Sequence, residues 1–333
     1  MANNLSREYL SFIIDYLNLK TNLFPSRNRI EAAGVNYFYS GAYPGKRLEK
    51  GRIMQTVKKR ILIETGYLGA NVSCLSTSRG LVFVDSPFLP EDGKKWADLT
   101  RKQTGQDAVY VINTDHHYDH VMGNIFLTPN VICHTKAARG LDYLSNKQVL
   151  KQVIREAFPD VLPKHESDID RLDLVTPHIT FDKRLTLDMG DATIVLEFVG
   201  GHSPATIMVY LVEEKTLFTG DNVEGQFPFF GQAHFRIWKE ALKKMLSMDI
   251  DLVVPGHGPL GGKEMVEKYF SFFEELEFEV REFRSQGLTI DEMAIKSKTI
   301  SFFPTEETEA RDQAGSWIRR QYKLAAEAVL KER

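Results

Sequence analysis

The feature that most constrains this chain is a cluster of histidines and aspartates, NTDHHYDH, at positions 113–120. It follows the apolar residues 108–112, and an apolar run that stops at polar residues predicts a strand ending in a loop. Side chains of an extended backbone alternate between its two faces, so we expect Asp115, His117 and Asp119 to point the same way. Nitrogen and oxygen atoms that converge at a strand end favour binding of a divalent metal ion.

His120 lies next in the turn and can fold back toward these side chains. A lone histidine is usually a surface or core residue, but this loop holds three histidines and two aspartates. Burying such a cluster without a metal would leave charges and donors unpaired. We therefore interpret the loop as part of a metal site.

Three downstream segments have the same construction, an apolar run, a turn of small residues and one potential ligand. They are VGGHSP with His202, FTGDN with Asp221, and VVPGHGP with His257. Glycine beside each ligand allows a tight turn close to an ion. Several strand ends that each deliver one ligand are typical of a site assembled at the edge of a sheet.

Together, the motifs TDHHYDH, GHSP, TGDN and PGHG resemble those of the metallo-β-lactamase superfamily of hydrolases, over about residues 58–262. The resemblance implies an α/β fold, a four-layer αβ/βα sandwich with the site at one edge between two sheets. It also implies two divalent ions, zinc first, with manganese or iron as alternatives. The implied ligands are Asp115, His117 and His202 for the first ion, Asp119, His120 and His257 for the second, and Asp221 as a bridge.

One position departs from the family pattern, because the usual loop begins with histidine where this chain has Asp115. His116 is adjacent but is expected to point to the other face of the strand, so we predict Asp115 as the ligand. A carboxylate there would favour manganese or iron, or weaken zinc retention. Alternatively, the first position is vacant, or Asp115 orients a ligand imidazole without binding the ion.

The resemblance implies hydrolysis by a metal-bound, bridging hydroxide that attacks a carbonyl or phosphoryl centre, with Asp119 orienting it and moving its proton. An ester, lactone, thioester or amide of a small molecule is the expected substrate. Tyr67 in the first hairpin, Phe229 in an apolar run and the nearby His234 are candidate substrate contacts, although packing or surface roles compete for each.

Two other functions remain open at this stage. A mononuclear-iron oxidoreductase similar to persulfide dioxygenases would use Asp115, His202 and Asp221. A non-catalytic binding relative would have lost the first position. Oxygen consumption by the iron-loaded protein would identify the former, and a protein inert even after metal addition would identify the latter.

Composition adds limits to partners and location. The chain has 333 residues, is 43% hydrophobic and 26% charged, and carries a net charge of −3, so nothing indicates a nucleic-acid partner. Cys74 and Cys133 lie in strand-like runs and are expected to be buried free thiols. Without a long apolar run or a signal-peptide pattern, we expect a cytoplasmic protein that does not enter the membrane.

Three regions are predicted along the chain: an N-terminal extension over 1–57, partly helical, a catalytic domain over 58–262 and a C-terminal helical extension over 263–333. Within the catalytic domain, the charged residues 136–172 are expected to be helical. In the C-terminal extension, the segment LTIDE at 288–292 predicts the capped start of a short helix. The tail resembles that of a superfamily branch of broad hydrolases related to quinoprotein-relay proteins. Helical extensions at both ends make a homodimer a further expectation.

Overall fold

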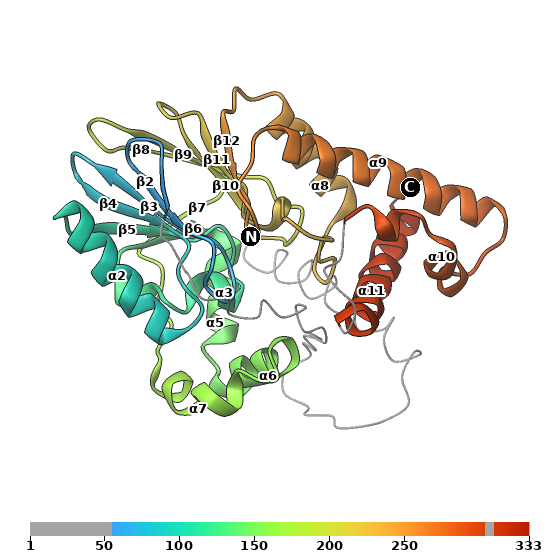
Figure 1. Ribbon diagram of the computed structural model, residues 1–333, viewed down its shortest axis with the longest axis horizontal. Coiled ribbons are helices and arrows are strands. Elements are labelled where there is room, and N and C mark those ends of the chain that lie inside the picture. The colour runs from blue at the N-terminus through green and yellow to red at the C-terminus, as the bar shows by residue number, and fades with distance from the viewer. Residues whose placement is uncertain (1–54, 304–309, 333) are drawn as a thin grey trace, which may run out of the picture. The chain divides into compact units, whose positions relative to one another are not determined.

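The computed structural model describes residues 55–303 and 310–332 (Figure 1). The predicted N-terminal extension therefore lies outside the described residues, except for 55–57. Within the described part, the first sheet has seven strands in the order in which they occur along the chain. They are β1 (Gln55–Val57), β2 (Ile61–Glu64), β3 (Val72–Thr77), β4 (Gly80–Val84), β5 (Ala108–Ile112), β6 (Val131–His134) and β7 (Ile179–Phe181). The first four strands pair antiparallel, and β4 to β7 pair parallel.

The second sheet has five strands in the order β12-β11-β10-β9-β8. They are β8 (Arg184–Asp188), β9 (Thr193–Phe198), β10 (Ile207–Leu211), β11 (Thr216–Phe218) and β12 (Leu252–Val254). Strands β8 to β11 pair antiparallel, whereas β11 and β12 pair parallel. The carboxyl ends of β11 and β12 therefore meet at one edge of the sheet.

The two sheets pack face to face, with their aliphatic side chains forming a common core. Val82 and Ile132 of the first sheet and Val209 and Phe218 of the second belong to this core and are nearly fully buried. Helices cover the outer faces: Trp96 of α2 (Pro90–Thr104) joins the cluster behind the first sheet. This arrangement confirms the predicted αβ/βα sandwich.

The charged region after β6 is helical, as predicted, and is divided into three helices. They are α5 (Thr135–Leu144), α6 (Lys147–Ala157) and α7 (Leu162–Arg171). Helix α6 ends before Pro159, and Pro163 occupies the first turn of α7, where its missing N–H costs nothing. The two prolines thus set the break between these helices.

The chain beyond the second sheet forms the helices α9 (Glu264–Ser285), α10 (Ile290–Lys296) and α11 (Ala310–Lys331), with the 3-10 turn η2 (Thr299–Ser301) following α10. Helices α9 and α11 pack on α8 (Phe235–Leu246), and α10 packs on α11. Helix α10 begins with a capping box between Thr289 and Glu292, which confirms the predicted capped start. Trp238 of α8, Phe273 of α9 and Tyr322 of α11 share one core cluster. The boundary drawn at 262 between catalytic domain and tail stays a prediction.

None of the helices in the described ranges is both long and apolar enough to cross a membrane.

Candidate metal centre

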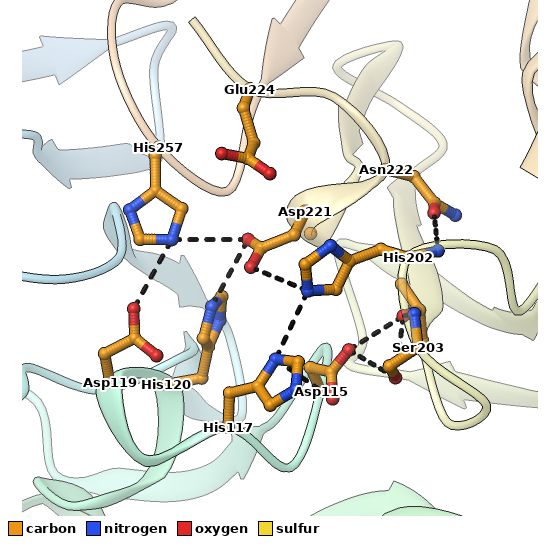
Figure 2. A network of polar contacts seen from close by, with 12 residues as sticks. Asp115, His117, Asp119, His120, His202, Ser203, Asp221, Asn222, Glu224 and His257 are labelled. Atoms are coloured by element: carbon orange, nitrogen blue, oxygen red, sulfur yellow. Dashed lines mark hydrogen bonds and ion pairs between the residues drawn. The ribbon is translucent and has the colours of Figure 1, made fainter. Parts of the chain in front are cut away.

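Four loops, each following a strand, bring the candidate ligands to one place (Figure 2). The loop after β5 leads into α3 (Tyr118–Val121), and that after β9 carries His202. Strand β11 runs into the turn η1 (Gly220–Asn222), which carries Asp221, and β12 leads to His257. All the predicted ligands are buried, none more than 8% exposed. The strand ends thus bring the side chains predicted as ligands close together.

Asp221 lies at the middle of the cluster and directs its two carboxylate oxygens to different neighbours (Figure 2). Its Oδ1 lies 3.3 Å from Nε2 of His120 and 3.5 Å from Nε2 of His257. Its Oδ2 lies 3.4 Å from Nε2 of His202. One carboxylate therefore faces two separate sets of histidines.

The remaining candidate ligands complete these two sets. Nδ1 of His117 lies 3.3 Å from Nε2 of His202, and Oδ2 of Asp119 lies 3.4 Å from Nε2 of His257. Ligand atoms bound to one tetrahedral ion at about 2.0–2.2 Å lie about 3.3–3.6 Å apart. The spacings agree with shared coordination better than with direct hydrogen bonds, whose N···O distances are about 2.9–3.0 Å.

Several of these atoms are buried without a hydrogen-bond partner. They are Asp119 Oδ2, His120 Nε2, His202 Nδ1 and Asp221 Oδ1. Buried polar atoms are usually paired, and three of these four face the centre of the cluster, where an ion would satisfy them. Two groups of buried side chains could hold a metal ion there, one of His117, His202 and Asp221 and one of Asp119, His120 and His257. The residues present therefore fit a metal centre.

The charges within the cluster are unevenly distributed in the metal-free protein. Burial lowers the pKa of His257, but Asp221 opposes this effect and the pKa is raised to about 9. Burial lowers the pKa of His117 to about 3, and the attraction of Asp115 does not offset it. Burial would raise the pKa of Asp221, yet the surrounding histidines hold it well below its usual value. An anionic carboxylate at the centre is the charge that a pair of cations requires.

Asp115 lies in the same region but has its own hydrogen-bond partners. It is fully buried, and its Oδ1 lies 2.7 Å from Nδ1 of His116 and 3.8 Å from Nδ1 of His117. These three residues form a third group that could hold an ion. His116 is also buried, and its ring lies against Gly140 of α5. The role of Asp115 as a ligand stays a prediction.

Asp85, which the motifs did not single out, orients one of the histidines. It follows β4, and its Oδ2 lies 2.9 Å from Nδ1 of His120, the ring nitrogen opposite Nε2. Its carboxylate also accepts hydrogen bonds from the backbone and hydroxyl of Thr114. A carboxylate on the far nitrogen of a ligand histidine fixes the ring and its tautomer. The polar residue ending the buried strand LVFVD was the available signal for this role.

Asn222 and Asn71 hold two of the ligand loops. Asn222 accepts a hydrogen bond from the backbone N–H of His202 at 2.9 Å and donates to Gly200. Asn71 donates to the carbonyl oxygens of Pro255 and Gly258, on either side of His257. Their partners lie far away in the sequence, so local patterns gave no sign of the contacts.

Glu224 is a further buried carboxylate next to the centre, beside Asp221 and His257 in Figure 2. It is 1% exposed, and its Oε1 has no hydrogen-bond partner, whereas Oε2 accepts one from Gln226. Burial, and then the negative charge of Asp221, raise its pKa to about 8. Its backbone forms an isolated β-bridge with that of His257, a contact that the sequence did not reveal.

The three candidate substrate contacts occupy different environments. Phe229 is partly exposed, and its ring centre lies 5.8 Å from that of His202. Tyr67 is 2% exposed and packs in the core against Trp96. His234 precedes α8, and its Nδ1 lies 2.7 Å from Oε1 of Glu332 near the end of the chain. Their roles toward a substrate stay predictions, and Phe229 is the one placed beside a candidate ligand.

Comparison with known proteins identifies the family of the chain. The family model of the metallo-beta-lactamase superfamily matches residues 58–257, so the chain belongs to that superfamily. Two relatives are metallo-beta-lactamases type 2. The protein of Elizabethkingia meningoseptica is 23% identical over 195 residues, covering 56% of this chain and 68% of its own length. That of Bacillus sp. (strain 170) is 25% identical over 215 residues, covering 61% and 74%.

Solved structures show the same fold at low sequence identity. A metallo-beta-lactamase from Pontibacter korlensis is 18% identical with a TM-score of 0.53, and the match covers 67% of this chain and 99% of that one. The stereoselective inverting sec-alkylsulfatase Pisa1 from Pseudomonas sp. is 13% identical with a TM-score of 0.63, and the match covers 97% of this chain and 61% of that one. The fold is thus shared with hydrolases of different named substrates.

Proposed function

We propose that this protein is a metal-dependent hydrolase that cleaves an ester, lactone, thioester or amide-type bond in a small molecule. The observation that carries the proposal is the division of the Asp221 carboxylate between two sets of ligand atoms, at spacings of 3.3–3.5 Å. This arrangement supports a two-ion centre bridged by Asp221. The histidine content of both sets supports zinc, with manganese or iron as alternatives.

Two bound ions would supply a hydroxide at neutral pH and polarise the substrate carbonyl. Residues of the chain would set the positions of the ions, orient their ligands and transfer a proton. Asp221 sets the spacing of the two positions, and Asp85 holds the ring of His120 in place through Nδ1. The Oδ2 of Asp119 lies 3.4 Å from Nε2 of His257, so this carboxylate would be close enough to take a proton and return it to the leaving group.

An apolar part of the substrate would lie against Phe229. This ring is partly exposed beside His202, whereas its neighbours Phe227 and Phe230 are buried in the core. Gly231 leaves room for the ring, since a Cβ there would lie 2.2 Å from Cζ of Phe229. An exposed aromatic ring beside a polar centre suits a substrate with a hydrophobic portion.

Hydrolysis of a panel of chromogenic esters, lactones, thioesters and anilides tests the proposal. We expect turnover by protein loaded with zinc or manganese, its loss after chelation and its recovery when the metal is returned. Asp119→Asn should lower kcat at least about 100-fold. Asp107→Asn is the matched control, because the Asp107 side chain is 82% exposed on the surface.

Three results would contradict the proposal. Hydrolysis that survives complete metal removal would exclude a metal-dependent mechanism. Oxygen uptake by iron-loaded protein without hydrolysis would favour the oxidoreductase alternative. Protein that binds no metal and stays inert after zinc, manganese and iron are added would favour a binding function.

A further inference from the structure

The carboxylate of Asp115 is engaged by hydrogen bonds from a second loop. Its Oδ2 accepts one from Oγ of Ser203 at 2.7 Å (Figure 2). The same oxygen accepts another from Oγ1 of Thr206, also at 2.7 Å. Its Oδ1 accepts one from the backbone N–H of His116 at 2.5 Å. Asp115 is 0% exposed, so these partners, together with the nearby imidazoles, account for its burial.

The distances also set Asp115 apart from the other candidate ligands. Its Oδ1 lies 3.8 Å from Nδ1 of His117, beyond the 3.3–3.5 Å that separate the paired atoms of the two ligand sets. Aspartate is shorter than the histidine that the family pattern places here. In the described residues, its ligand atoms group with those of His116 and His117 and not with those of His202 and Asp221.

Ser203 and Thr206 belong to the loop that carries His202. Thr206 closes this loop, because its carbonyl oxygen accepts hydrogen bonds from the backbone of Val199 and Gly200. Ser203 in turn accepts a hydrogen bond from the backbone of Ala205. The Asp115 carboxylate therefore links this closed loop to the loop of His117. Ser203 and Thr206 lie 88 and 91 positions after Asp115 in the sequence.

We propose that Asp115 is a positioning residue that holds His202 against His117 through Ser203 and Thr206 and does not bind the metal. This inference rests on the proposed metal-dependent function. The first position then keeps three protein ligands, His117, His202 and Asp221, whereas the second has four. The two positions therefore differ in affinity, and the three-ligand position is the weaker one.

The test is stepwise titration of the full-length, metal-free protein with Zn²⁺ by calorimetry, and with Co²⁺ followed by its visible absorption. We expect two binding steps in the wild type. The double variant Ser203→Ala/Thr206→Val leaves the Asp115 carboxylate in place and removes its donors. It should lower the affinity of the weaker of the two metal-binding steps about 10–100-fold and leave the tighter step unchanged. Asp115→Ala should have the same effect.

Asp115→Asn is the conservative variant, because its amide oxygen can still accept hydrogen bonds from the two hydroxyls of the His202 loop, and only the bond from the backbone N–H of His116 is lost. It should keep two bound metals per chain and the Co²⁺ spectrum of the wild type, since no ligand is lost. Circular dichroism of each metal-free variant serves as the control for folding.

The opposite pattern would overturn the inference. If Asp115 is a ligand, Asp115→Asn loses the more weakly bound metal ion and the Co²⁺ absorption bands of that ion. The double variant then binds this ion as tightly as the wild type or more tightly. The readout is binding and not turnover, so it separates the two proposals. Two-step binding without any hydrolysis would contradict only the proposed function, and hydrolysis with loss of one metal in Asp115→Asn would contradict only this inference.

Discussion

The carboxylate of Asp221 fills the space that a side chain on Gly256 would need. A Cβ built on Gly256 would lie 1.9 Å from Oδ1 of Asp221 and 2.8 Å from its backbone nitrogen. The PGHG loop can thus approach the central carboxylate only because position 256 has no side chain.

Gly256→Ala is therefore expected to displace Asp221 and to abolish binding of both metals. Elemental analysis should find less than about 0.2 metal ions per chain, with the secondary structure retained. Gly105→Ala is the control, because a Cβ on Gly105 meets no atom within 4 Å and only its positive φ of 72° is strained. It should cost about 1–2 kcal/mol of stability and keep both metals. Normal metal content in Gly256→Ala would contradict the expected displacement.

Asp85→Ala should weaken the metal held by His120. Without the hydrogen bond to Nδ1, the ring loses its fixed tautomer and orientation, which typically costs 10–100-fold in metal affinity. A competition titration with a coloured zinc chelator measures this change. Asp107→Asn, on the surface, should leave the affinity unchanged. An Asp85→Ala affinity within a factor of about two of the wild type would show that the contact does not support the ligand.

Phe229→Ala should slow the hydrolysis of some substrates and not of others. Contact of the substrate with this ring should contribute about 1.5–3 kcal/mol to binding of the transition state. Its removal should lower kcat/KM about 10–100-fold for esters with long apolar groups. Small polar esters should be hydrolysed as before. Phe278→Ala, which alters a ring that is 71% exposed on α9, is the matched control. Loss of small-ester turnover with long-chain turnover retained would contradict this role.

Gln321 of α11 holds the backbone of Phe230, the residue that follows Phe229. Its side-chain oxygen accepts a hydrogen bond from the backbone N–H of Phe230 at 2.8 Å, and Gln321 is 2% exposed. Gln321→Leu would leave that N–H buried and unpaired, which should lower the free energy of unfolding by about 1–3 kcal/mol. Chemical denaturation measures this loss. Gln286→Leu, at an exposed position, should change stability by less than about 0.5 kcal/mol.

The two cysteines should be unreactive in the native protein. Both are buried free thiols, and burial raises the pKa of Cys133 to about 12 and that of Cys74 further. At pH 8, about one Cys133 in 10⁴ would be a thiolate. A disulfide reagent should therefore titrate no thiol in the native state and two in urea.

The same shifts imply a pH effect on stability. Thiols of the unfolded chain ionise near their usual pKa, and those of the folded chain do so only at higher pH. The folded state therefore loses stability as pH rises from about 9 toward 12. One rapidly titrating thiol in the native protein at pH 8 would contradict this burial.

Local residue patterns were sufficient to predict the elements that build the site. The apolar run before residue 113 predicted β5, and the segment LTIDE predicted the capped start of α10 at Thr289. Apolar runs that end in glycine and one ligand indicated that His202, Asp221 and His257 would converge, and the structure places both histidines against the carboxylate of Asp221. These features depend on backbone geometry over a few residues, which neighbouring side chains determine directly.

The tertiary structure alone decided which atoms meet across the site. The partners of Asp115 are Ser203 and Thr206, and the backbone of Phe230 is held by Gln321, 91 residues away. Glu224 is buried, and its backbone forms an isolated β-bridge with that of His257, 33 residues further along the chain. Such contacts follow from how two sheets and the C-terminal helices pack. The hydrogen bonds at 2.7–2.8 Å depend on that packing and not on spacing along the chain.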